Sequence, residues 1–221
     1  MSGRGRPRAN ALPPDLGPRE FVSATGVSRE TLARLKRYVE TLADWNARHN
    51  LVSRSSFEDV WRRHVWDSAQ LAPLILPSAN SLVDLGSGAG FPGLVLAILM
   101  HERSTFRTVL YESIRKKAAF LEAAAKSADV PVEIRCNRIE EASTEIFDIV
   151  TARACAPLTK LLGYAQRFQG QKTANFFLKG QDVEAELTEA HKSWRMQVIP
   201  HASRTDQSGT ILEIRELARV R

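Results

Sequence analysis

The sequence predicts an α/β protein whose single domain is built on a doubly wound, mostly parallel sheet. Three observations lead to this fold class. A strand pattern, a glycine loop and an apolar helix pattern follow one another over residues 81–100. Further along the chain, strand and helix patterns alternate, as they do in parallel sheets that are covered by helices on both faces. The last two strand patterns have no helix between them, which predicts an antiparallel hairpin at the C-terminal end.

The N-terminal part is expected to be a disordered basic tail followed by helices. Residues 1–20 are rich in Arg, Gly and Pro, and such a segment buries too little apolar surface to become ordered. Apolar side chains at steps of three or four predict one helix from its N-cap Ser28 to about Asn50, and a second from Phe57 to Leu71. We therefore expect a single domain at 21–221, with N-terminal helices at 28–76 and a core at 80–221.

Seven short runs of apolar and β-branched residues predict the strands of the sheet. The segment that follows the second run, residues 113–122, is typical of an amphipathic helix. Its first turn contains Arg115, Lys116 and Lys117. These cations oppose the helix dipole, and they suit either a polyanion or a solvated face. The strand runs are residues 82–85, 109–112, 132–136, 148–152, 176–178, 196–199 and 210–216.

Composition limits the classes of protein that this chain can be. Its 221 residues with 43% apolar content are enough for one sizeable core. No apolar run reaches the roughly 18 residues of a membrane span, and no signal peptide follows the N-terminal arginines, so we expect a cytoplasmic monomer that does not bind membranes. Cys136 and Cys155 fit neither a redox motif nor a zinc pattern. We expect both to be reduced and mostly buried, and no metal to be bound.

The charge of the chain favours a nucleic-acid partner. The net charge is +6, and residues 1–70 contain 12 basic but only 8 acidic residues. A positive surface of this kind suits a phosphate backbone. The N-terminal part is therefore expected to carry the substrate surface.

The loop after the first strand predicts a nucleotide-type cofactor. Gly86, Gly88 and Gly90 alternate, which permits positive φ angles and leaves no Cβ between the backbone and a ligand. The loop also satisfies the dinucleotide pattern G-x-G-x-x-G. Against a pyrophosphate, however, Pro92 removes a backbone donor, and Asp84 places a carboxylate beside the loop. Both residues favour S-adenosylmethionine, whose sulfonium and ammonium groups attract a carboxylate.

A second carboxylate is expected at the end of the next strand, where it would bind the ribose hydroxyls. Glu112 ends that strand. The alternative is an ordinary exposed glutamate at a strand end.

The pattern Asp84-x-Gly86-x-Gly88-x-Gly90 resembles motif I of the class I S-adenosylmethionine methyltransferases, whose Rossmann-like fold ends in such a hairpin. Six segments in order, over roughly residues 28–216, resemble one family more closely. That family is the bacterial small-subunit ribosomal RNA guanine-N7 methyltransferases, once called glucose-inhibited division protein B. The segments are Asn46-x-x-x-Asn50-Leu51-Val52-Ser53, Arg63-His64-Val65-x-Asp67-Ser68, the glycine loop through Phe91-Pro92-Gly93, Arg138-Ile139-Glu140-Glu141, Thr151-Ala152-Arg153-Ala154 and Leu178-Lys179-Gly180.

The resemblance implies cofactor contacts at Gly86, at Phe91 and around Glu112. It also implies contacts at Ile139, Glu140 and Arg153. Ile139 would pack against the adenine face while Glu140 meets its edge, although this segment also fits an ordinary strand-to-helix connection. Arg153 would hold the methionine carboxylate or a substrate phosphate, or it would form a structural ion pair. The sequence departs from the family at Glu112, where Asp is usual, and at Cys155, where an apolar residue is expected.

Transfer to guanine N7 requires little from the protein, because N7 carries a lone pair and no proton. Proximity and orientation are the main requirements, and the chain shows no obvious catalytic dyad. The substrate-side candidates are Arg153, Lys179 and His64. The histidine is equally well interpreted as structural, bonded to a carbonyl or to a carboxylate such as Asp67. The expected RNA contacts are Arg62, Arg63 and Lys179. Trp61 and Trp66 are candidates for stacking on a flipped guanine or for core packing.

Other functions remain open at this stage. Adenine-N6 methyltransferases resemble one another in a motif that residues 151–155 lack. A cytosine-C5 enzyme would need a nucleophilic cysteine, for which Cys155 is the candidate. An NAD-dependent oxidoreductase would keep the glycine loop, and a non-catalytic RNA-binding module would leave no methyl mark. The expected partner is 16S ribosomal RNA or a precursor of the small ribosomal subunit.

Overall fold

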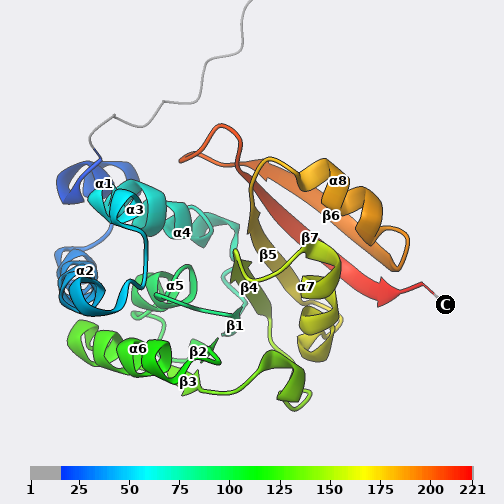
Figure 1. Cartoon of the computed structure of the whole chain (residues 1–221), viewed down its shortest axis with the longest axis horizontal. Helices are drawn as coiled ribbons and strands as arrows, with labels where there is room; N and C mark the ends of the chain where they lie inside the picture. Colours follow the sequence, from blue (N-terminus) through cyan, green and yellow to red (C-terminus); the bar gives the residue numbers. More distant parts are fainter. Residues whose placement is uncertain (1–15, 221) are drawn as a thin grey trace, which may run out of the picture.

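A seven-stranded sheet runs through the middle of the computed structural model, which describes residues 16–220 (Figure 1). The strand order is β3-β2-β1-β4-β5-β7-β6. Strands β1 to β5 are parallel, and β7 lies antiparallel to both β5 and β6. The predicted α/β class and terminal hairpin are confirmed. The strands are β1 (Ser81–Leu85), β2 (Arg107–Tyr111), β3 (Glu133–Arg135), β4 (Ile149–Arg153), β5 (Ala174–Lys179), β6 (Trp194–Ala202) and β7 (Thr210–Arg219).

Helices cover both faces of the sheet. Figure 1 shows α1 to α6 gathered on one side and α7 and α8 on the other. Three apolar clusters form beneath these layers. One includes residues of α2, α5 and α6, one includes residues of α7, and the third lies where residues 71–79 pack on β1 and β5. The helices are α1 (Pro18–Thr25), α2 (Arg29–His49), α3 (Arg54–Glu58), the π-helix η1 (Trp61–Trp66), α4 (Asp67–Ala69), η2 (Ala72–Leu74), α5 (Gly93–Leu99), α6 (Arg115–Ala128), η3 (Ile139–Glu141), α7 (Leu158–Ala165), η4 (Gln166–Phe168) and α8 (Val183–Ala190).

The expected tail is wrong at its C-terminal end, because α1 begins at Pro18. Glu20 accepts a hydrogen bond from the Gly17 N–H at 3.0 Å, which caps the helix start. Phe21 is fully buried and contacts Trp66 edge-on at 5.5 Å. This anchor offsets the entropy cost of ordering the short helix. Residues 1–15 of the predicted tail lie outside the described residues.

The helix predicted from Ser28 is confirmed. The Ser28 Oγ accepts from the Thr31 N–H at 3.1 Å, and the helix ends before Asn50, whose φ is 46°. The helix predicted from about Phe57 to Leu71 is present, but it is neither continuous nor regular. Helix α3 ends before Asp59, and the chain is helical again through η1 and α4. The wider π-helical turn of η1 places three consecutive residues in the interior. These are His64, Val65 and Trp66.

Helix α2 runs antiparallel to α6. Near the start of α2, Arg34 and Arg37 donate to the carbonyls of Ala128 and Ser127 at 2.9 and 2.6 Å, and these carbonyls end α6. Such bonds satisfy carbonyl groups that a helix C-terminus leaves unpaired. The arrangement brings the middle of α2 over the glycine loop that follows β1.

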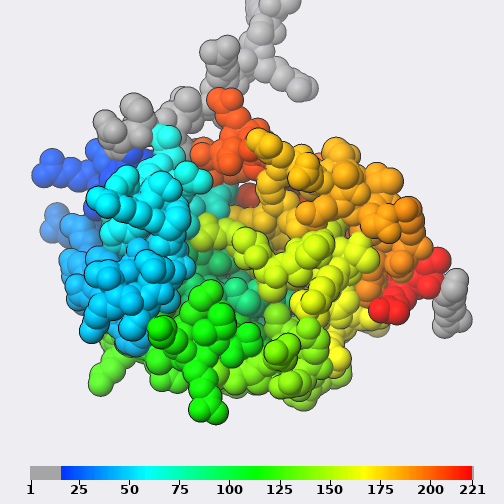
Figure 2. Space-filling model, viewed as in Figure 1, coloured from blue at the N-terminus to red at the C-terminus, as the bar shows by residue number. Residues whose placement is uncertain are grey.

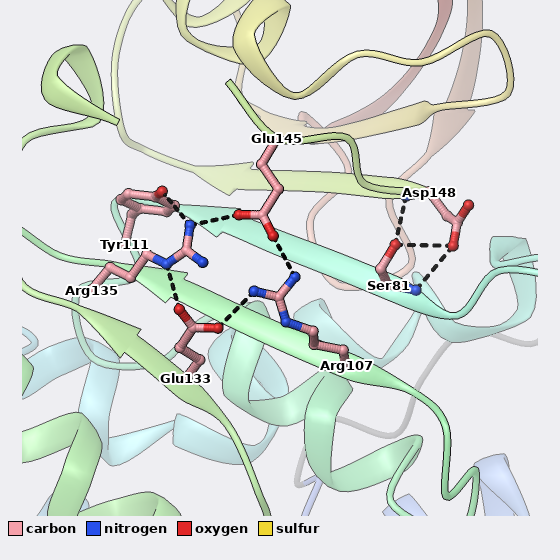
Figure 3. Close-up of polar contacts among 7 residues, drawn as sticks. All are labelled: Ser81, Arg107, Tyr111, Glu133, Arg135, Glu145 and Asp148. Atoms are coloured by element: carbon pink, nitrogen blue, oxygen red, sulfur yellow. Dashed lines mark hydrogen bonds and ion pairs between the residues drawn. The ribbon is translucent and has the colours of Figure 1, made fainter. Parts of the chain in front are cut away.

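Ion pairs close the far edge of the sheet (Figure 3). Arg107 binds Glu133 at 2.7 Å and Glu145 at 2.6 Å, and Arg135 binds the same two carboxylates at 2.6 and 2.7 Å. Arg135 also donates to the Tyr111 hydroxyl at 2.8 Å. The ring ties edge strand β3 to the end of the loop that carries η3. Because these side chains are partly exposed, each pair contributes at most about 1 kcal/mol.

Candidate active site

The glycine loop after β1 has the backbone that the sequence predicts. Gly86, Gly88 and Gly90 have φ angles of 70°, 57° and 92°, which other residues rarely adopt. A Cβ at Gly86 would lie 2.7 Å from the Cys155 sulfur, and one at Gly90 would lie 2.9 Å from the Tyr38 hydroxyl. A Cβ at Gly88, however, would meet only a backbone oxygen at 3.8 Å. The loop is therefore packed at two glycines and open at the middle one, which leaves a cradle that a side chain would fill.

Glu112 is buried rather than exposed at the strand end. One carboxylate oxygen accepts from the Gly88 N–H at 2.9 Å, and the other accepts from the Ile114 N–H at 2.7 Å. The alternative of an exposed glutamate is therefore wrong. Since each carboxylate oxygen has two acceptor positions, both oxygens keep one for a further donor.

Asp84 lies at the end of β1 beside Thr151 of β4, and only 1% of it is exposed. Its Oδ1 accepts from the Thr151 hydroxyl at 2.7 Å. Its Oδ2 faces Gly93 at the start of α5 and has no well-aligned donor within residues 16–220. Burial raises the pKa of this carboxyl to about 6. An incompletely paired buried carboxylate beneath an open glycine loop fits a cationic cofactor better than a pyrophosphate.

The segment predicted to hold the adenine follows β3, so it lies at the same carboxyl edge of the sheet. Ile139 is largely buried. Glu140 is exposed and accepts from the Tyr164 hydroxyl at 2.6 Å, and this bond holds the pKa of the glutamate below its usual range. Glu145 anchors the end of the loop through the ion-pair ring (Figure 3).

Arg153 joins the glycine loop to η1. Its guanidinium donates to the Arg63 carbonyl at 2.9 Å and pairs with Asp67 at 3.2 Å. It also donates to His64 Nδ1 at 2.8 Å and lies 5.0 Å from the centre of the Phe91 ring. The His64 ring stacks on Phe91 at 4.7 Å. The structural ion pair of Arg153 is thus present. Asp67, one candidate partner for a structural His64, binds Arg153, and His64 accepts from Arg153 as well.

His64 is neutral in this cluster. Burial and the nearby Arg153 lower its pKa to about 3. Because Nδ1 accepts from Arg153, the ring proton sits on Nε2, which has no partner among the described residues. An imidazole in this state donates a hydrogen bond without adding a charge.

A cavity of about 870 Å³ opens beside this cluster. Figure 2 shows the surface hollowed between the cyan N-terminal helices and the yellow and orange C-terminal elements. Its wall is closed by Asp67, which accepts from the Thr205 hydroxyl at 2.6 Å, and by Gln70, which accepts from the Arg204 N–H at 2.9 Å. Its lining includes all the predicted substrate-side cations, namely Arg62, Arg63, Arg153 and Lys179, together with His64.

The cationic side chains of the cavity differ in how accessible they are to a ligand. Lys179 pairs with Glu186 at 2.6 Å, and its side chain is only 10% exposed. Arg63 is exposed and Arg62 is half-buried. An RNA phosphate at Lys179 would therefore compete with Glu186, whereas Arg63 is directly accessible.

Trp61, Trp66 and Cys136 lie outside the site, whereas Cys155 packs against Gly86 of the glycine loop. Trp66 is buried and Trp61 contacts Phe21 at 5.7 Å, so both pack in the core and neither lines the cavity. Cys136 is exposed, so the prediction of burial is wrong; it follows β3, the edge strand. Burial raises the pKa of the Cys155 thiol to about 11, which argues against a nucleophilic role.

Several contributing residues have no clear signal in the sequence. Tyr38 looks like one more apolar position of α2, although its hydroxyl reaches the glycine loop. Glu186 and Thr205 contact the site from segments outside the recognised motifs. Within residues 16–220, no cluster of His, Cys, Asp and Glu is placed to hold a metal, and none of the helices is long and apolar enough to cross a membrane.

Comparisons with known proteins show the family to which the chain belongs. The family model GidB, described as rRNA small subunit methyltransferase G, matches residues 31–212. Proteins named Ribosomal RNA small subunit methyltransferase G are similar over most of the chain. The one from Caulobacter vibrioides is 45% identical, with 91% of this chain and 92% of that protein covered. The one from Rhodospirillum centenum is 47% identical, with 90% of each covered.

Solved structures share the fold at low identity. An O-methyltransferase from Bacillus cereus in complex with SAH has a TM-score of 0.58 at 15% identity, with 89% of this chain and 96% of that chain covered. A ribosomal protein L11 methylase from Lactobacillus delbrueckii subsp. bulgaricus has a TM-score of 0.53 at 14% identity, with 70% and 77% covered. The predicted fold class is thereby confirmed.

Proposed function

Since the chain belongs to the GidB family, rRNA small subunit methyltransferase G, we propose that the strand ends and the adjoining cavity together form its active site. The enzyme transfers a methyl group from S-adenosylmethionine to N7 of a guanine in 16S ribosomal RNA, with G527 as the family's target. The observation that carries the placement is the Phe91–His64–Arg153 cluster, because it joins the open glycine loop to the cationic cavity.

On the cofactor side, S-adenosylmethionine supplies an electrophilic methyl group on a sulfonium. Glu112 binds the ribose hydroxyls with its two free acceptor positions. The open face at Gly88 lets the cofactor lie against the backbone. Ile139 and Glu140 would hold the adenine, and the Asp84 carboxylate would stabilise the positive charge of the cofactor.

On the substrate side, the cavity takes the target guanosine while Arg62, Arg63 and Lys179 bind neighbouring phosphates. The attacking N7 carries no proton, so the chain supplies orientation rather than a base. The base becomes cationic during the transfer. A neutral His64 avoids adding a second charge beside it, and the Arg153 charge is offset by its ion pair with Asp67.

We further propose that residues 21–221 act as one methyltransferase domain, as a monomer in the cytoplasm. The substrate is 16S RNA, free or within a small-subunit precursor. The test is methyl transfer to small-subunit particles and to deproteinised 16S RNA, both taken from cells that lack the enzyme. We expect 7-methylguanosine at one position in mass mapping. A mark on cytosine C5 or adenine N6 would contradict the proposed reaction, and the better of the two substrates identifies the natural form.

A further inference from the structure

Tyr38 connects the N-terminal helices to the cofactor loop. Its hydroxyl donates to the Ala89 carbonyl at 2.5 Å, and the side chain is fully buried in the middle of α2. The ring contacts Phe91 at 5.5 Å and Phe120 at 6.5 Å between ring centres. Packing therefore fixes the ring, and the hydroxyl is aimed at one peptide of the glycine loop.

The peptide between Ala89 and Gly90 is held from both ends. Tyr38 binds its carbonyl, while its N–H, on Gly90, donates to the Ser87 carbonyl at 2.7 Å. Gly90 has a φ of 92°, and a Cβ there would stand 2.9 Å from the Tyr38 oxygen. Any rotation of this peptide breaks two buried hydrogen bonds, so the two contacts select one loop conformation.

The hydroxyl is suited to a fixed donor role. Burial raises the pKa of Tyr38 well above its ordinary value of 10, so the group keeps its proton. A buried carbonyl needs a donor, and the phenol supplies one without a charge next to the cofactor site.

We propose that Tyr38 is a positioning residue, which holds the glycine loop in the conformation that binds S-adenosylmethionine and thereby makes α2 part of the cofactor site. The inference rests on the proposed placement of the cofactor over this loop. It adds a residue that lies in the N-terminal helices, outside the sheet and its loops.

The test compares Tyr38→Phe with a matched control, Thr173→Val. Each change deletes one buried hydroxyl that donates to a backbone carbonyl and keeps the shape of the side chain. The Thr173 hydroxyl donates to the Phe147 carbonyl at 2.7 Å, at the amino ends of β4 and β5 and away from the glycine loop. For Tyr38→Phe we expect the S-adenosylmethionine Kd to rise roughly tenfold. The kcat at saturating substrates and the KM for RNA should stay within about twofold. The control should keep the wild-type Kd even if it loses as much thermal stability.

Amide hydrogen exchange in the ligand-free protein gives an independent readout. In Tyr38→Phe, protection should fall at the Gly90 amide while the amides of β1 and β4 follow global stability. Equal cofactor affinity in wild type and Tyr38→Phe would overturn the inference. An equal loss of affinity in the control variant would do the same, as would amide exchange that rises uniformly over the chain rather than at Gly90. If Tyr38→Phe did not fold, exchange at the Gly90 amide of the wild-type protein would decide the point, because exchange as fast as that of exposed loop amides would overturn the inference.

The inference and the cofactor placement fail in distinguishable ways. If Gly88→Val also left the affinity unchanged, the placement of the cofactor would be wrong. If Gly88→Val weakened binding and Tyr38→Phe did not, the role of Tyr38 alone would be wrong.

Discussion

Around the glycine loop the protein offers backbone groups and two buried carboxylates, whereas the adjoining cavity is lined with charged side chains that bind one another. Glu112 holds two backbone N–H groups with both oxygens. In the cavity, Arg153 is paired with Asp67, and Lys179 with Glu186. The loop and its two carboxylates, which we call the cofactor half, are therefore in place before a ligand binds. In the cavity, which we call the substrate half, the proposed RNA phosphates would compete with these internal partners.

The largest effect is expected from the buried charge of the cofactor half. The pKa of Asp84 is raised from 3.8 to about 6 in the folded protein. Its contribution to stability is therefore fully present below pH 3.8 and is lost as the pH rises through about 6, because folding then has to bury a charge. The loss amounts to about 3 kcal/mol.

Asp84→Asn removes this titration and keeps an oxygen that can accept from Thr151. Denaturant unfolding of the two ligand-free proteins from pH 4 to pH 7 measures the difference. The wild type should lose stability relative to the variant across this range. If the difference in unfolding free energy between the two proteins did not change with pH, charging Asp84 in the folded protein would cost no free energy. The cofactor half would then be more hydrated than its burial indicates.

The second effect concerns the open face of the loop. In Gly88→Val a branched side chain occupies the space where only a backbone oxygen lies nearby, and φ at 57° becomes strained. We expect the affinity for S-adenosylmethionine to fall by at least tenfold, or about 1.4 kcal/mol. RNA binding should not change. Calorimetry on the folded variant is the measurement, and an unaltered Kd would remove the cradle from the site.

The third effect tests the cavity. Arg62→Glu together with Arg63→Glu should weaken RNA binding roughly tenfold and lower the slope of log affinity against log salt by about 2. The affinity for S-adenosylmethionine should stay the same. Arg195→Glu with Lys172→Glu is the matched control, because it makes the same change in charge at exposed positions that do not line the cavity. Equal slopes in filter binding for both pairs would move the RNA surface elsewhere.

The contrast between the glycine loop and the cavity also explains which parts of the site could be predicted from the sequence. The glycine loop and Glu112 are readable because each is local: positive φ angles require glycine, and a strand that ends in an acid places that acid at the edge of a parallel sheet. All the strand runs became strands of one sheet for the same reason. Periodicity also located α2, including its cap at Ser28.

The cavity could not be derived in this way, since its contacts join segments far apart in the chain. The pairing of Arg153 with Asp67 depends on the π-helical turn of η1, and periodicity predicted an ordinary helix there. Glu186 and Thr205 approach only after α8 and the terminal hairpin have packed. The resemblance to a family located His64 and Lys179, but the partners that neutralise or occupy them are tertiary.

The smallest effect is expected at the border between the two halves, at Cys155. Its sulfur packs against Gly86, and burial together with the nearby Asp84 and Glu112 raises the pKa of the thiol to about 11. The thiol is therefore protonated at neutral pH, and attack by N7 needs no covalent enzyme intermediate. Cys155→Ser keeps the size of the side chain, so the single-turnover rate of methyl transfer should remain within about twofold of wild type. A loss of several orders of magnitude in a folded variant, together with a covalent RNA adduct on the wild-type protein, would instead assign the enzyme to cytosine-C5 chemistry.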